Sequence, residues 1–483
     1  MAERNEGSEN TKQSRRKSRS ILTIADGVLR GTAAPTQVLS VAGSDGQQSQ
    51  RHVRLVTDLC LRVGESMLAT GASAADVVAM VLRLSAAYGV DGMHVDITFT
   101  SITVSVHRGM NEDPMSVMRI VQVRTTDYTR LQNVYLLIEE IIEGGGQLGV
   151  EQARQRLTAI LTSPHPYRRW VVTLGKAILT GGVVVLFDVG LVLVFVAAVS
   201  AVISDLITRQ LGKWSVPGFF AQMTAAVATT SIAVSLFWLR SVGIEVPGSD
   251  APTVIVIAGI VMLLSGLGLT SAARDAIDGY YVTATARGME VFMLTLGLAV
   301  GISAVLGIAL RVGIPVDIST PLGDGIGLVS GVAGAALIGC GFALTSYVRL
   351  RLVPLMAAAT AAVMAVFLLV SPYVDQPGLA PGIAAVAAGV IGHLTYRWLK
   401  VPEGATTTAA IIGLIPGLAV YRALYVLVDS STGVLEALPA AVDALATGIG
   451  LAAGTAIGVF LARRIFGLDR QAMIAARRAR GVR

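Results

Sequence analysis

The chain has 483 residues, of which 53% are hydrophobic and only 14% are charged, and its mean hydropathy is +0.67. This composition excludes an ordinary soluble globular protein and indicates that the lipid bilayer is the main solvent of the chain. The formal net charge is +6. Lys and Arg occur singly or in pairs at the ends of apolar runs and in the two tails, which indicates a role in membrane topology and not a nucleic-acid partner.

Four regions follow along the chain. The first 50 residues are rich in Ser, Gln, Gly and Arg, and we expect a disordered basic tail without a signal peptide. Residues 51–165 have ordinary charged content and predict a cytoplasmic α+β domain. Residues 166–466 consist of successive apolar runs, which predict a transmembrane domain, and residues 467–483 form a basic cytoplasmic tail.

Within the cytoplasmic domain the hydrophobic period changes once from helical to alternating and then back. Apolar residues recur at spacings of three and four after Arg51, and Ser73 with Asp76 predicts the N-cap of a second helix. The alternation that follows Gly89 is typical of strands. The predicted elements are helices over 53–68 and 73–89, strands over 94–99, 102–106 and 117–123, and helices over 131–143 and 151–161.

Two side chains of the first strand could suggest acid–base chemistry. His94 and Asp96 would lie on the same side of this strand, but no nucleophile or metal ligand stands at a recognisable spacing, so a solvated strand face is favoured. Cys60 and Cys340 have no CxxC or Cys/His spacing and are interpreted as packing residues. We therefore expect no enzyme activity, no cofactor and no metal site.

The membrane domain is expected to contain ten helices, because each span needs about 20 mostly apolar residues. Their expected bounds are 170–186, 189–207, 216–239, 251–271, 288–310, 325–346, 353–371, 380–397, 405–427 and 438–462. Lys and Arg alternate between the connecting segments in the way the positive-inside rule requires if both termini are cytoplasmic.

A weak internal repeat relates the two halves of this domain at an offset of 151 residues. It pairs Gly266 with Gly417 and Gly297 with Gly448, and the string Leu-Leu-Ser-Gly-Leu with Leu-Ile-Pro-Gly-Leu. The two strings lie on the fourth and ninth spans, five helices apart. The sequence therefore predicts two inverted five-helix repeats, as in many secondary transporters.

The same two strings predict helix breaks. Pro416 removes a backbone donor and should free the carbonyl of Ile412, while Gly417 lowers the cost of leaving helical geometry. Ser265 and Gly266 form the corresponding weak point. Unwound backbone near the midplane can bind the carboxylate and ammonium of an amino acid. The alternative interpretation is a packing kink, since Gly and Pro are frequent in membrane helices.

Five charged residues lie close to the fourth and fifth spans. An ionisable group kept in the membrane indicates a substrate pathway or a proton relay, and Asp275 and Glu290 are the best candidates because they lie nearest to the apolar runs. For Arg274, Asp278 and Arg287 a cytoplasmic loop is an equally good interpretation.

Several separated motifs occur in an order that resembles the bacterial threonine/serine exporter family. They are His94-Val95-Asp96-Ile97-Thr98, the stretch from Ile257 to Gly279 with its Leu-Leu-Ser-Gly core, Val282-Thr283-Ala284, Ala286-Arg287 with Glu290, and Pro416-Gly417-Leu418 with Tyr421-Arg422. The resemblance covers residues 51–464. Asp278 departs from the family pattern, which puts a special role for that acid in doubt.

This resemblance implies export of threonine and serine across the plasma membrane, driven by protons. The implied partners are these small-molecule substrates, protons and the lipid bilayer; the sequence leaves open whether copies of the chain form a homo-oligomer. The residues implied for the substrate pathway are Ser265, Gly266, Thr270, Asp275, Gly279, Arg287, Glu290, Pro416, Gly417, Tyr421 and Arg422, with His94 and Asp96 as a motif of the N-terminal domain.

Two other classes are weighed against a secondary transporter. A membrane-tethered enzyme with its active site in the N-terminal domain would need a clustered nucleophile and base, which the sequence does not show. A passive small-solute channel would need rings of like charge or repeated filter segments, which are also not visible.

Overall fold

The computed structural model describes residues 50–107, 114–121, 125–244, 251–263, 266–314, 326–429 and 433–466. Both predicted tails lie outside these residues, apart from residue 50. The described chain divides into two compact units. The first runs to Pro164 and also contains the segment Asp275–Thr285, and the second contains His165–Arg274 and the chain from Ala286 onwards.

The first unit contains a three-stranded antiparallel sheet in the order β1-β2-β3. Its strands are β1 (Met93–Ile97), β2 (Ser101–Val106) and β3 (Met115–Ile120). Val104 of β2 lies opposite Val95 on one side and Val117 on the other. Side chains of β2 alternate between buried and half-buried, as the period of two requires. The third strand begins two residues earlier than predicted, and the end of its predicted range lies outside the described residues.

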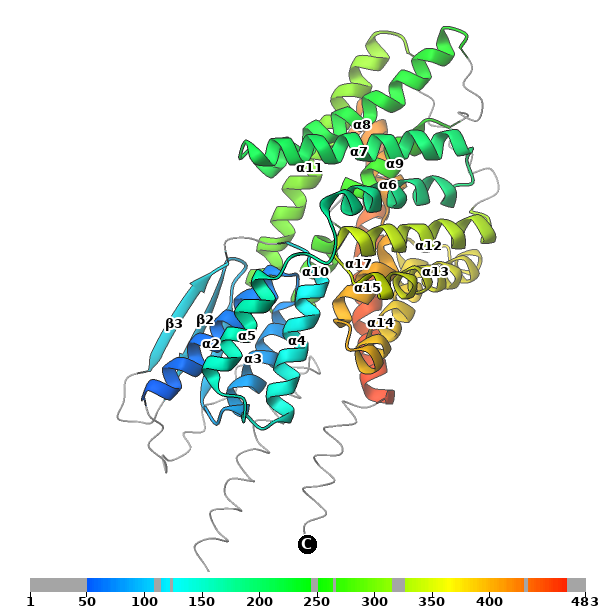
Figure 1. Cartoon of the computed structure of the whole chain (residues 1–483). Coiled ribbons are helices and arrows are strands. Elements are labelled where there is room, and N and C mark those ends of the chain that lie inside the picture. The colour runs from blue at the N-terminus through cyan, green and yellow to red at the C-terminus, as the bar shows by residue number, and fades with distance from the viewer. Residues whose placement is uncertain are drawn as a thin grey trace, which may run out of the picture. The chain divides into compact units, whose positions relative to one another are not determined.

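Four helices accompany this sheet, and they cover one of its faces (Figure 1). They are α2 (Gln50–Ala69), α3 (Ala74–Ala87), α4 (Tyr128–Glu143) and α5 (Val150–Thr162). The predicted N-cap is confirmed, because the Ser73 hydroxyl accepts a hydrogen bond of 3.2 Å from the N–H of Asp76. Cys60 is fully buried in α2, and this burial raises the pKa of its thiol. Cys60 is therefore a packing residue of this core, as predicted.

The second unit is helical throughout its described residues. Its elements are α6 (Arg169–Leu186), α7 (Leu191–Lys213), α8 (Gly218–Ser241), α9 (Thr253–Leu263), α10 (Gly266–Ile277), α11 (Tyr281–Arg311), α12 (Leu328–Thr345), η1 (Leu350–Leu352), α13 (Val353–Val370), η2 (Ser371–Tyr373), α14 (Leu379–Leu399), α15 (Glu403–Ile411), η3 (Ile412–Leu414), α16 (Gly417–Asp429) and α17 (Gly433–Phe466). The end of α10 and the start of α11 belong to the first unit.

Eight of the described helical stretches are long and apolar enough to cross a bilayer, so the chain is a multi-pass membrane protein. They are α6, α7, α8, α11, α12, α13 with its flanking 3-10 turns, α14 and α17. The expected number of ten spans is not confirmed by these eight stretches. The predicted ninth span is divided into α15, η3 and α16, because Pro416 cannot continue a helix. The fourth is described as α9 and α10, and the two residues between them lie outside the described part of the chain.

Glycines bring two pairs of helices into backbone contact. A Cβ at Gly454 of α17 would overlap the carbonyl oxygen of Gly382 on α14. A Cβ at Gly182 of α6 would lie 2.9 Å from the carbonyl oxygen of Gly334 on α12. Such close approach is the usual basis of helix association in membranes, where burial of apolar surface gives little driving force. These contacts fix α14 against α17 and α6 against α12 (Figure 1).

Candidate functional site

The second predicted helix break is present at Pro416. After the 3-10 turn η3, Ile415 adopts an extended conformation with φ −61° and ψ 132°, and α16 begins at Gly417. The expectation that Ile412 would have a free carbonyl is wrong, because this oxygen accepts a hydrogen bond of 3.4 Å from the N–H of Ile415. The tighter 3-10 pattern supplies a donor that Pro416 itself cannot.

Gly417 packs directly against α9. A Cβ at this position would lie 2.7 Å from Val261 Cγ2 and 3.4 Å from the carbonyl oxygen of Ile257. Only a residue without a side chain allows α16 to start this close to α9. The break at Pro416 therefore lies against the helix that leads into the other predicted break.

The first predicted break, at Ser265 and Gly266, lies partly outside the described residues. Ser265 lies outside the described residues, while Gly266 begins α10 and Thr270 lies on that helix. The side-chain amide of Gln222 on α8 donates to the carbonyl of Leu263, the last described residue of α9. Gln222 was missed by the sequence analysis, although a Gln inside an apolar span is a signal that could have found it.

Buried hydroxyl groups lie on α7 and α8, the helices that pack against α9. Ser204 of α7 and Thr229 of α8 share a hydrogen bond of 2.8 Å, and a Cβ at Gly259 of α9 would overlap the methyl group of Thr229. Ser200 and Thr230 are also buried, and their hydroxyls have no hydrogen-bond partner among the described residues. A buried polar group without a partner is uncommon and marks a position where another polar molecule could bind.

A buried cluster of charged groups surrounds Glu403 at the start of α15. Its side chain is 8% exposed, and its carboxylate lies 3.0 Å from Arg463 Nη2 on α17 and 3.6 Å from Arg274 Nη2 on α10. His393 of α14 places Nδ1 at 3.8 Å from the same carboxylate. One acid thus connects four helices, and it joins the helix that precedes the Pro416 break to the helix that begins at Gly266.

The sequence analysis missed this cluster except for Arg274. Glu403, His393 and Arg463 each stand near the end of an apolar run, where a charged residue normally reaches water or lipid headgroups. The only signal in the sequence is a lone acid at the start of the ninth predicted span.

Asp275 belongs to the first unit, where its side chain is fully buried. One carboxylate oxygen accepts a hydrogen bond of 3.1 Å from the N–H of Ala74, the first residue of α3. Helix N-termini favour such negative charge because their first N–H groups are unpaired within the helix. In the same segment the hydroxyl of Thr283 donates to the carbonyl of Ile97 at 3.0 Å. Both bonds attach the connection between α10 and α11 to the fold of the first unit.

This connection is shorter than the predicted loop, because α10 ends at Ile277 and α11 begins at Tyr281. Gly279 has φ +89°, a left-handed conformation that favours glycine and makes the sharp turn possible. Tyr280 follows, with its hydroxyl buried. Burial raises the pKa of Tyr280, and the carboxylates of Asp278, Asp275, Asp76 and Asp96 raise it further.

The other residues predicted for the pathway differ in burial. Arg287 and Glu290 lie on α11 instead of in a loop or at the start of a span, with Arg287 buried and Glu290 exposed. Tyr421 is fully buried on α16, and its neighbour Arg422 is exposed. His94 and Asp96 are both exposed on β1. Partial desolvation of the His94 ring and, to a smaller extent, the nearby His107 lower the pKa of His94.

No group of three or more His, Cys, Asp or Glu side chains in the described ranges could hold a metal ion. The bundle also contains helix ends, buried hydroxyl groups and paired charges. The fold defines a multi-pass membrane protein.

Two family models match the chain. The model described as "Putative threonine/serine exporter" matches residues 58–309, and the model described as "Threonine/Serine exporter, ThrE" matches residues 331–463. The chain belongs to the threonine/serine exporter family, as the resemblance predicted. No solved structure matches the chain.

Individual relatives agree with this assignment. A "Probable threonine/serine exporter" of Mycobacterium tuberculosis is 35% identical over 90% of this chain and 82% of its own length. A "Threonine/serine exporter" of Corynebacterium glutamicum is 32% identical over 85% of this chain and 83% of its own. A "Probable succinate transporter subunit YjjP" of Escherichia coli is 26% identical over 53% of this chain and 95% of its own.

Proposed function

We propose that this protein exports threonine and serine across the plasma membrane as a proton-coupled secondary transporter, with both termini in the cytoplasm. The observation that carries this proposal is the similarity, over most of both chains, to two relatives named as exporters of these amino acids. The alternation of Lys and Arg along the sequence supports the orientation.

The substrate binds at the two helix breaks. Gly417 supports this location, because its contact with α9 brings the Pro416 break to the helix that ends before Ser265. The positive end of α16 suits the substrate carboxylate, and carbonyl groups left unpaired at a helix end suit its ammonium. The buried hydroxyls of Ser200 and Thr230 are candidates to bind the substrate hydroxyl, because they have no other partner among the described residues.

The transmembrane part consists of two inverted five-helix repeats. In the second half α17 packs on α14 through Gly454, and in the first half α11 packs on α8, where a Cβ at Gly301 would overlap the carbonyl oxygen of Met223. The long helices α11 and α17 thus make the same kind of glycine contact with the third and eighth predicted spans. Both also follow a predicted helix break, as the repeat requires.

The Glu403 cluster holds one conformation of this site closed. Its ion pair with Arg274 connects α15 to α10. α15 is the half-helix that precedes the break at Pro416, and α10 is the half-helix that follows the break at Ser265 and Gly266. Alternating access requires these half-helices to move relative to other helices. Separation of Arg274 from Glu403 would then accompany opening.

Asp275 is the proposed proton carrier, with Glu290 as the second candidate. A carboxylate that is desolvated in one conformation and hydrated in another binds and releases a proton as the conformation changes. Asp275 has the burial that this requires, and its bond to Ala74 gives it a partner that could be released. Glu290 is exposed on α11.

The test is transport by the purified protein in proteoliposomes. Labelled threonine and serine should move, a pH gradient should accelerate net movement, and labelled valine should move much more slowly. Succinate is included because relatives of partial coverage carry that name. Movement of succinate without movement of threonine or serine would overturn the proposed substrate, and equal rates with and without a pH gradient would overturn proton coupling.

A further inference from the structure

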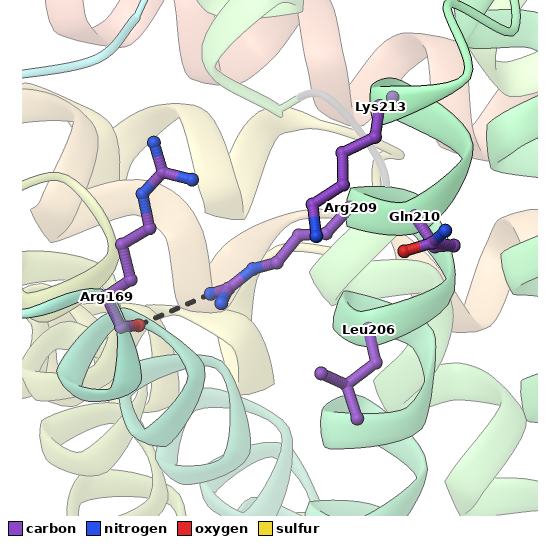
Figure 2. Close-up of a pocket in the computed structure, with 6 residues that line it drawn as sticks. Arg169, Leu206, Arg209, Gln210 and Lys213 are labelled. Atoms are coloured by element: carbon purple, nitrogen blue, oxygen red, sulfur yellow. Dashed lines mark hydrogen bonds between the residues drawn. The ribbon is translucent and has the colours of Figure 1, made fainter.

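A pocket of about 590 Å³ opens at the end of the membrane bundle where α6 begins and α7 ends (Figure 2). Arg169 contributes from α6, and the other lining residues come from one side of α7. The lining residues are Arg169, Leu206, Arg209, Gln210, Gly212 and Lys213. Three of these six residues are cationic and none is acidic.

The positive charge of this pocket is only partly compensated. Asp205, which is 2% exposed, is the acid beneath it, and its carboxylate already binds Arg209 Nη2 at 2.6 Å and Lys176 Nζ at 2.7 Å. Arg209 also donates to the backbone carbonyl of Arg169 at 3.3 Å, the dashed line of Figure 2. The side chains of Arg169 and Lys213 have no acidic partner among the described residues. The Asp205 carboxylate therefore already binds two cations, while Arg169 and Lys213 of the pocket lining remain available for an anion.

Exposed aromatic residues place this pocket at the border between lipid headgroups and hydrocarbon. Trp170 follows Arg169 and is 62% exposed, and Trp214 follows Lys213 and is 66% exposed. Tryptophan is enriched at this level of the bilayer because its ring is apolar while its N–H is polar. An arginine or lysine next to such a tryptophan can reach the phosphate groups of the lipids.

An apolar stripe leads from the pocket along the lipid-accessible surface of α7. Leu206 lines the pocket and is 56% exposed, and Ile203, Val199 and Phe195 continue at helical spacing, all of them exposed. From Leu206 to Phe195 the helix rises about 17 Å, which is close to the length of an extended acyl chain in one leaflet. A ligand that is anionic at one end and aliphatic over the rest fits both features.

We propose that this pocket is a binding site for an anionic phospholipid. Its phosphate lies between Arg169 and Lys213, and one acyl chain lies along the stripe from Leu206 to Phe195. Arg209 helps to shape the pocket and stays paired with Asp205. This site is separate from the helix breaks and does not depend on the identity of the exported substrate.

The test is lipid binding to the full-length protein in detergent, measured by native mass spectrometry. Phosphatidylglycerol and phosphatidylcholine of identical acyl chains are compared on the wild type and on Arg169→Gln/Lys213→Gln. The wild type should retain phosphatidylglycerol preferentially. The double variant should bind it about thirtyfold more weakly, the factor that two cations near an anionic lipid supply. Arg169→Lys with native Lys213 should keep the preference, because the site needs charge and not a guanidinium.

The matched control is Arg240→Gln/Arg351→Gln, which also removes two exposed cations but leaves the pocket intact. It should bind phosphatidylglycerol as the wild type does. Equal loss in both double variants would overturn the proposal, because the effect would then be that of net charge. Competition by glycerol 3-phosphate at the same concentration as the lipid would also overturn it, since the pocket would then be a site for soluble phosphate. Loss of the folded state in melting curves of the pocket variant, but not of the control, would also overturn the proposal. Arg169 and Lys213 would then be needed for stability and not for lipid binding.

Discussion

Replacement of Glu403 by Gln tests whether the buried charge cluster holds the bundle together. The change keeps the shape of the side chain but removes the negative charge that lies 3.0 Å from Arg463 Nη2 and 3.6 Å from Arg274 Nη2. Both guanidinium groups would then stay largely buried, with side-chain exposures of 15% and 19%. Removing one partner of a buried ion pair is strongly unfavourable, because the remaining charge keeps its cost of desolvation.

The expected loss of stability is about 3–5 kcal/mol, the range for removing one partner from a buried ion pair. The matched control is Glu140→Gln, which breaks a pair of 2.6 Å with Arg156 in the first unit. Both side chains of that pair are more than half exposed, so the control should change stability by about 0–1 kcal/mol. The contrast between the two variants separates burial from loss of a charge as such.

The measurement is unfolding of the detergent-solubilised protein by titration with a denaturing detergent, followed by near-UV circular dichroism. Arg463→Gln and the double variant Glu403→Gln/Arg463→Gln complete a double-mutant cycle. The double variant should be more stable than the sum of the single changes predicts, because it leaves one uncompensated guanidinium fewer than Glu403→Gln. Strict additivity, or a Glu403→Gln loss no larger than that of Glu140→Gln, would refute the role of the cluster.

Three further predictions concern transport and topology. Gly417→Leu should abolish threonine export while leaving membrane insertion intact, because its side chain would enter the space occupied by Val261; normal transport in proteoliposomes would reduce the break to a packing kink. Asp275→Asn should remove gradient-driven export but keep some exchange without a pH difference; unchanged concentrative export would place proton coupling elsewhere, and loss of exchange and binding together would assign Asp275 to substrate or folding. A single cysteine at exposed Gln376 should react with a membrane-impermeant maleimide on intact cells and one at Lys213 should not; labelling at Lys213 would reverse the orientation.

Local signals in the sequence were sufficient where neighbouring residues decide the structure. Ser73 with Asp76 predicted a helix N-terminus that is present, and the alternation before and after Thr100 predicted the strands β1 and β2. The helix break at Pro416 follows from the missing N–H of proline alone. The hydrogen bond of the Ile412 carbonyl could not be predicted from the sequence, because it depends on whether the turn is α-helical or 3-10.

Composition and periodicity also determined the class of the protein. Apolar runs of membrane-spanning length leave few alternatives to a helical bundle, since each backbone polar group must be paired within the bilayer. The family could be named from short motifs in a fixed order, because such motifs persist where side chains or backbone geometry are constrained. Neither argument says which helices touch.

The contacts between distant parts of the chain were decided by tertiary structure. Ala74 and Asp275 are 201 residues apart, and Glu403 and Arg463 are 60 residues apart. Asp275, Glu403 and Arg463, each taken alone, resemble ordinary polar residues near the end of a helix. Their burial and pairing arise only when several helices pack together, because the free energy of a charged group depends on the solvent that its neighbours exclude. The sequence therefore determined the class, the family and one helix break, while tertiary structure decided that Asp275 binds α3 and that Glu403 joins the two half-helices.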